Sequence, residues 1–106
     1  MPTAIKKITR EELLSQLAHI EKDVDRRKFL TRHKALIHSE VVKQLADLVV
    51  EKIRVDTKDA LHLAEAAVLI GRKLRRKEDI ALSTRAKANA LYACGDNRAT
   101  IPLGGE

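Results

Sequence analysis

Aromatic side chains are almost absent from this chain of 106 residues, which contains one Phe, one Tyr and no Trp. The core must therefore be aliphatic, built from Leu, Ile, Val and Ala. The shortage also argues against single-stranded nucleic acid as a ligand, because proteins that bind it usually stack the bases on aromatic rings. Cys94 is the only cysteine, so the chain cannot form an internal disulfide. The lack of disulfides is typical of proteins from the reducing cytosol.

Long apolar runs are missing as well. The longest covers residues 66–71, whereas a membrane-spanning helix needs about 20 apolar residues. Residues 1–7 contain no apolar segment of the kind found in signal peptides. We therefore expect a cytoplasmic protein with no membrane partner. The length fits one domain over residues 1–106, with residues 1–8 and 97–106 frayed.

What the chain does have is helical periodicity, with no glycine or proline between residues 3 and 70. This pattern predicts an all-α fold of about five helices arranged in antiparallel hairpins. The sequence Thr9-Arg10-Glu11-Glu12 forms a capping box at the start of a short first helix. A second helix begins at Asp23 and is predicted to fray or break within residues 33–38.

Three further helices follow along the chain. Ser39 is the predicted N-cap of the third helix, and Asp56 is the predicted N-cap of the fourth. The fifth helix covers about residues 78–94 and ends at Gly95. We predict the left-handed conformation for Gly95, as is common for a glycine directly after a helix.

Small residues form stripes on the fourth and fifth helices, and such stripes let neighbouring backbones approach closely. The two stripes consist of Ala60, Ala64, Ala67 and Gly71, and of Ala86, Ala90 and Ala93. The opposite face of the fourth helix is polar and is predicted to be exposed to solvent. That face carries Lys58, His62, Glu65, Arg72 and Arg76.

Residues 85–96, which cover the second half of the fifth helix and the turn after it, resemble the first helix of a tetratricopeptide repeat. The matching residues are Ala88, Asn89, Leu91, Tyr92, Gly95 and Asp96. Residues 60–67 are similar to the second helix of such a repeat. Residues 39–96 together resemble the irregular helical region ahead of tetratricopeptide arrays in large bacterial proteins, some of which carry a caspase-like CHAT peptidase domain. The resemblance implies α-solenoid packing and a role in protein–protein interaction.

The resemblance also implies a peptide-binding site. In that family the first helix of each repeat lines a concave groove, and Arg85 and Asn89 match positions that in some members contact the terminal carboxylate of a peptide. With Tyr92 and Asp96 they follow one another at helical spacing. Arginine can donate two parallel hydrogen bonds to a carboxylate, and asparagine can add a third. The alternative is a solvated helix face on which Asn89 and Tyr92 stabilise a repeat interface.

The densest run of positive charge covers residues 72–77. Together with Arg26, Arg27 and Lys28 it could bind the phosphates of a nucleic acid. The alternative is that these cations complement the dipole at the C-terminus of a helix. A helix-turn-helix is not predicted, because residues 75–77 provide no glycine for the turn between the two helices.

Catalytic and metal-binding motifs are sparse. Arg27 and His33 match the spacing of the arginine and histidine in small helical ribonucleases. The four histidines contain no i, i+4 pair, and Cys94 has no CxxC partner, so we expect neither a metal nor a cofactor.

We therefore interpret the chain as a non-enzymatic interaction module that binds a peptide or a partner helix. It would act as a free scaffold or adaptor, or as the N-terminal part of a larger protein. The predicted binding residues are Arg85, Asn89 and Tyr92. Two alternatives stay open, a basic helical nucleic-acid-binding protein and a small helical ribonuclease. A homo-oligomer formed through the end of the fifth helix is also compatible with the pattern.

Overall fold

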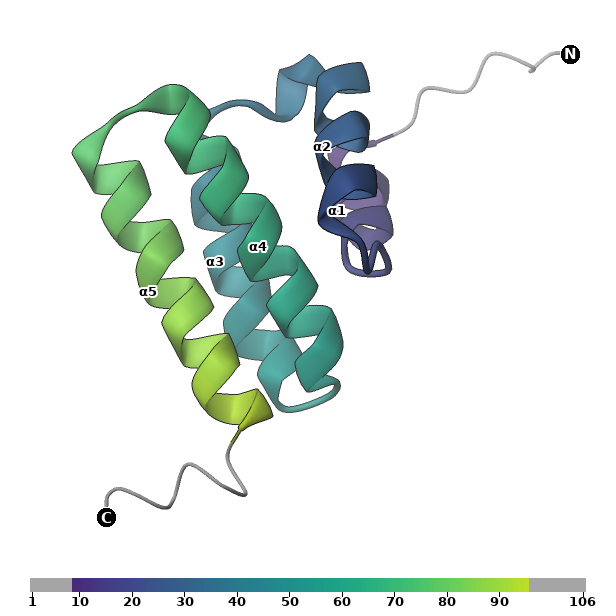
Figure 1. The fold of residues 1–106 in the computed structure, drawn as a ribbon, viewed down its shortest axis with the longest axis vertical. Helices are drawn as coiled ribbons and strands as arrows, with labels where there is room; N and C mark the ends of the chain where they lie inside the picture. Colours follow the sequence, from purple (N-terminus) through teal and green to yellow (C-terminus); the bar gives the residue numbers. More distant parts are fainter. Residues whose placement is uncertain (1–8, 96–106) are drawn as a thin grey trace, which may run out of the picture.

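The computed structural model describes residues 9–95, which form five α-helices and contain no strand (Figure 1). This confirms the predicted all-α fold. The helices are α1 (Arg10–Leu17), α2 (Asp23–Arg32), α3 (Ser39–Ile53), α4 (Thr57–Leu74) and α5 (Lys77–Cys94), with one short 3₁₀ turn, η1 (Lys34–Leu36). The terminal segments that we predicted to fray lie outside the described residues.

Two of the predicted helix starts are confirmed. The Thr9 hydroxyl accepts a hydrogen bond from the N–H of Glu12 (3.2 Å), and the Glu12 carboxylate accepts one from the N–H of Thr9 (3.0 Å), which completes the capping box. The Asp56 carboxylate accepts hydrogen bonds from the N–H groups of Lys58 and Asp59 at the start of α4. The predicted break after α2 is also present, since α2 ends at Arg32 and η1 follows.

The predicted N-cap of α3 is wrong by one residue. His38 is the cap, and its Nδ1 accepts from the N–H of Glu40 at 3.1 Å. Ser39 is already inside the helix, and its hydroxyl donates instead to the Asp79 carboxylate in the first turn of α5 at 2.7 Å. Asp79 is buried, and a buried carboxylate needs hydrogen-bond donors. The side chain of Ser39 therefore makes a long-range hydrogen bond to Asp79 instead of the capping hydrogen bond that its position in the sequence predicts.

The prediction for Gly95 is also wrong, because its φ of −97° lies outside the left-handed region. The left-handed residue is Arg75, with φ 59° and ψ 24°, directly after α4. The Arg75 N–H donates to the carbonyl of Gly71 at 2.9 Å and closes the last turn of the helix. We predicted no helix-turn-helix because residues 75–77 contain no glycine for the turn. That reason does not hold, since Arg75 itself adopts the left-handed conformation that glycine usually provides.

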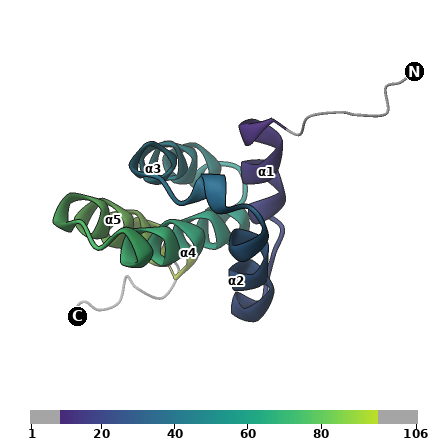
Figure 2. The ribbon, with the colours of Figure 1, turned by 90° about the horizontal axis from the view of Figure 1, so that it is seen from above.

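Helices α3, α4 and α5 lie side by side and pack against one another as a three-helix bundle (Figures 1 and 2). The predicted small-residue stripes lie at these contacts. Ala60, Ala64, Ala67 and Gly71 of α4 and Ala86 and Ala90 of α5 are buried, and Ala93 is half-buried. A Cβ at Gly71 would stand 2.9 Å from Ser83 Oγ and 3.2 Å from the carbonyl oxygen of Asp79. The backbones of α4 and α5 therefore meet at Gly71 with no room for a side chain.

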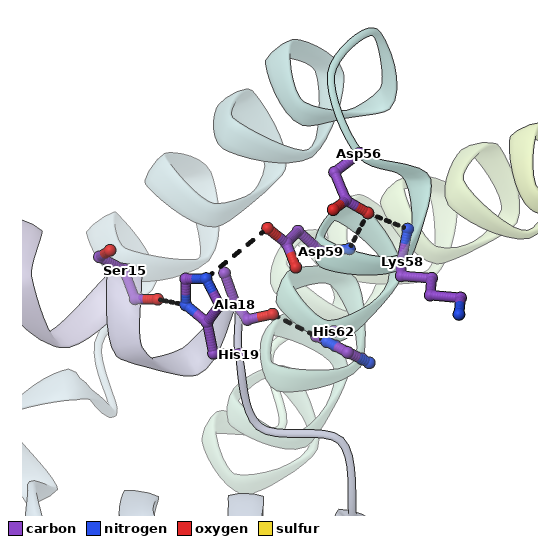
Figure 3. Close-up of polar contacts among 7 residues, drawn as sticks. All are labelled: Ser15, Ala18, His19, Asp56, Lys58, Asp59 and His62. Carbon is purple, nitrogen blue, oxygen red and sulfur yellow. Dashed lines mark hydrogen bonds and ion pairs between the residues drawn. The ribbon is translucent and has the colours of Figure 1, made fainter.

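Helices α1 and α2 run crosswise to the bundle and contact it mainly through α4 (Figure 2). Leu14, Leu17, Phe29 and Leu30 complete the apolar core from this side. Figure 3 shows the polar contacts at the same junction: His62 Nδ1 donates to the carbonyl of Ala18 at 2.8 Å, and His19 Nε2 lies 3.9 Å from Asp59 Oδ2. His62 is therefore half-buried under the end of α1, so the prediction of an exposed polar face is wrong at this position. It is also wrong at Glu65, which is half-buried beside Lys87 of α5.

The close approach at Gly71 gives a first prediction. Gly71→Val should lower the free energy of unfolding by about 1–3 kcal/mol, because the added methyl groups overlap Ser83 and the backbone of α5. Gly95→Val is the matched control and should change stability by less than about 0.5 kcal/mol. Its Cβ would meet only the carbonyl oxygen of Leu91, at an ordinary distance of 3.5 Å. Urea unfolding followed by circular dichroism measures both values, and equal stability of the two variants would contradict the packing described here.

Candidate binding surfaces

The predicted peptide-binding residues Arg85, Asn89 and Tyr92 are all exposed on α5. They lie away from α4, on a face defined here as the outer face of α5. The opposite side of the helix is occupied: Lys87 Nζ lies 3.3 Å from Glu65 Oε1 of α4, and Cys94 Sγ donates to the carbonyl of Thr57 at 3.4 Å. Asp96, the last residue of the predicted stripe, lies outside the described residues.

Large apolar side chains are also exposed on α5 and on α3. Tyr92 is 67% exposed and Leu91 48%, and on the neighbouring helix α3 Val50 is 56% exposed. Both helices are held firmly by their buried faces, so these side chains stand on rigid supports. Tyr92 shares the face of Arg85 and Asn89, whereas Leu91 is turned about 100° from Tyr92 around the helix. Single exposed apolar residues are normal on a protein surface, and Tyr92 is the apolar side chain that this face offers to a partner.

A second feature is a cleft of about 730 Å³ between α2 and the C-terminal end of α4. Its floor is apolar, and its rim carries four cations and no carboxylate. The lining residues are Arg27, Leu30, Thr31, Leu69, Arg72, Lys73 and Arg75. We call this feature the basic cleft. It brings Arg27 to the basic run that follows it by some 45 residues in the sequence, whereas Arg26 points into the protein and Lys28 lines a different cavity.

Buried Arg26 fixes the position of α2. Its side chain is 3% exposed, and its guanidinium donates to the carbonyl of Ile20 at 2.7 Å and to Asp23 Oδ1 at 3.1 Å. The other oxygen of Asp23 lies 3.0 Å from Nε of Arg27. One carboxylate therefore orients two arginines, the inner one closing the loop between α1 and α2 and the outer one standing at the basic cleft. Sequence reasoning grouped these arginines together because no local signal distinguishes the buried one from the exposed one.

Arg75 enters the basic cleft from a backbone conformation that arginine rarely adopts. For a residue with a Cβ, the left-handed region is about 1–2 kcal/mol less favourable than the right-handed one, and glycine carries no such penalty. The helix dipole accounts for cations at the end of α4, but it does not favour an arginine over a glycine at this particular position. Strain of this kind concentrates where a side chain has a role outside folding.

The residues of the ribonuclease alternative lie at different places. Arg27 pairs with Asp23, whereas the His33 ring packs against Phe29 with ring centroids 4.6 Å apart. Among residues 9–95 no group of three or more His, Cys, Asp or Glu side chains gathers as a metal would require. Within the same residues, no helix combines the length and apolar character needed to cross a membrane.

Comparison of the chain with protein-family models, with curated proteins and with solved structures gives no match. The tetratricopeptide resemblance therefore stays a prediction, and the function has to be argued from the two surfaces described above.

Arg26 and Arg27 give a second prediction, because they share one partner but differ in burial. Arg26→Ala should lower the free energy of unfolding by about 2–4 kcal/mol, since it leaves the Ile20 carbonyl without its donor and empties a buried position. Arg27→Ala should lower it by less than about 1 kcal/mol, because that ion pair is largely exposed to water. Denaturant titration of the two variants checks the difference, and equal losses would contradict the role given to Arg26.

Proposed function

We propose that this chain is a non-enzymatic interaction module whose helices pack in the manner of a tetratricopeptide solenoid. In this proposal the outer face of α5 binds an extended peptide that carries an acidic or C-terminal carboxylate. The observation that carries it is the exposure of Arg85, Asn89 and Tyr92 together on one face of a helix whose opposite face is buried in the bundle.

The chemistry of these three side chains suits such a ligand. Arginine donates two parallel hydrogen bonds to a carboxylate and asparagine adds a third. Among residues 9–95, no ion pair already occupies Arg85. The Tyr92 ring is a large and rigid apolar surface on which a peptide side chain can pack at a low entropic cost. The arrangement therefore provides one charged anchor and one apolar anchor on the same helix.

The neighbouring helix supports the same proposal. Val50 of α3 is exposed, and α3 packs directly against α5. In a solenoid of helical hairpins, alternate helices face the same side and present one continuous binding surface. Here α3 and α5 are the alternate helices, with α4 between them along the chain. A peptide lying across α3 and α5 would contact the apolar groups of both helices.

The third prediction tests this proposal with a displayed library of peptides that have free C-terminal carboxylates. Selected peptides should lose at least about tenfold in affinity when the C-terminus is amidated, because the charge-assisted hydrogen bonds are lost. Arg85→Ala combined with Asn89→Ala should weaken the free-acid peptide by a similar factor and should leave the amidated peptide unchanged. Fluorescence polarisation with labelled peptides measures these affinities.

Arg32→Ala is the matched control, since Arg32 is an exposed arginine of α2. It removes the same charge from another surface and should leave peptide affinity unchanged. If amidation and the Arg85/Asn89 double substitution have no more effect than Arg32→Ala, then the outer face of α5 is not a carboxylate-binding surface.

A further inference from the structure

We propose that the basic cleft between α2 and α4 is a binding site for linked phosphate groups, separate from the outer face of α5. The site consists of Arg27, Arg72, Lys73 and Arg75 around an apolar floor. Its ligand carries two or more phosphates in a chain, as in a free polyphosphate or in the backbone of a nucleic-acid duplex.

The basic cleft has an excess of positive charge. Four cations line this cleft, and the only carboxylate paired with any of them among residues 9–95 is Asp23, on Arg27. Asp23 is also bonded to Arg26, so it does not neutralise Arg27 completely. Arg72, Lys73 and Arg75 form no ion pair within the described residues. Bringing like charges into one concave site is unfavourable, and an anion of several charges relieves the repulsion.

The backbone conformation of Arg75 points to the same site independently of its charge. Position 75 has φ 59°, a value that favours glycine. An arginine is present here although its backbone is strained, and the residue lies at the exposed edge of the cleft. A function of that side chain explains its presence, whereas the needs of the turn do not.

The cations of the cleft are of the kind that suits phosphate. Guanidinium groups match the geometry of phosphate oxygens and bind them bidentately. Three of the four cations are arginines, one on α2 and two at the C-terminal end of α4, so a ligand in the open cleft can meet guanidinium groups from both sides. No aromatic residue lines the cleft, so it offers no ring on which a base could stack. The cleft therefore offers contacts to phosphate groups and none to bases.

The test uses the full chain and two probes, inorganic tripolyphosphate in isothermal titration calorimetry and a short RNA duplex in fluorescence anisotropy. The protein should bind at least one of them at low salt. Arg72→Gln should weaken binding about tenfold, as expected for the loss of one charge-assisted contact. For the duplex, the slope of log affinity against log salt concentration should fall by about one for each cation removed.

Arg75→Gly separates a binding role from a structural one. It should weaken phosphate binding about tenfold while leaving the melting temperature the same or higher, because glycine suits φ 59° better than arginine does. Arg54→Gln is the control of equal charge change. Arg54 is exposed at the end of α3, beside the opposite end of α4 from the cleft, and its substitution should leave both affinities unchanged.

The outcomes distinguish the sources of phosphate. Saturable binding of tripolyphosphate that Arg72→Gln and Arg75→Gly weaken identifies a site for a compact polyphosphate. Binding of the duplex alone, weakened by the same two variants and not by Arg54→Gln, identifies a nucleic-acid backbone. The proposal is overturned if neither probe binds, or if Arg54→Gln weakens binding as much as the cleft variants do, which would indicate diffuse surface charge.

Discussion

The close approach of α4 to its neighbours is the constraint on which the rest of the structure depends. A chain with one Phe, one Tyr and no Trp cannot fill wide gaps between helices with large rings. Its helices must instead come near one another, and the alanines of α4 and α5, with Gly71 where a Cβ would have no room, make this possible. Buried Ala and Gly contribute little area each, so the stability comes from the Leu, Ile and Val side chains that the short distance brings into contact.

Helix α4 is the common support of everything else, because α3, α5, α1 and α2 all pack against it. It carries an apolar stripe for the bundle and polar residues for the crosswise pair of helices, with His62 bonded to Ala18 and Asp59 lying 3.9 Å from His19. The two candidate surfaces lie on different sides of this support. The outer face of α5 belongs to the bundle alone, whereas the basic cleft needs both α2 and α4.

Features decided within one turn of helix could be predicted from the sequence. The capping residues Thr9 and Asp56 bond to N–H groups two or three residues ahead, and the small-residue stripes follow from helical spacing. Features decided by distant residues could not. Ser39 donates a hydrogen bond to Asp79, which is forty residues away in the sequence. Arg27 lies near the end of α4 only because of the orientation in which α2 packs on the bundle. The exposure of Arg85, Asn89 and Tyr92 followed from spacing. Their role and the tetratricopeptide packing stay predictions, because neither follows from local geometry.

The helix pair α1 and α2 is attached less extensively than the helices of the bundle are to one another, and this difference affects how the protein can move. The bundle of α3, α4 and α5 is held by extensive packing, while α1 and α2 touch it mainly along α4. Units joined by so few contacts open separately, at a free energy below that of complete unfolding. Opening of α1 and α2 away from the bundle would separate the walls of the basic cleft, because one wall is on α2 and the other on α4. A ligand in the cleft binds only the closed form and so shifts the equilibrium towards closure in proportion to its concentration over its Kd. Occupancy of the cleft is in this way coupled to the rigidity of the N-terminal third of the chain.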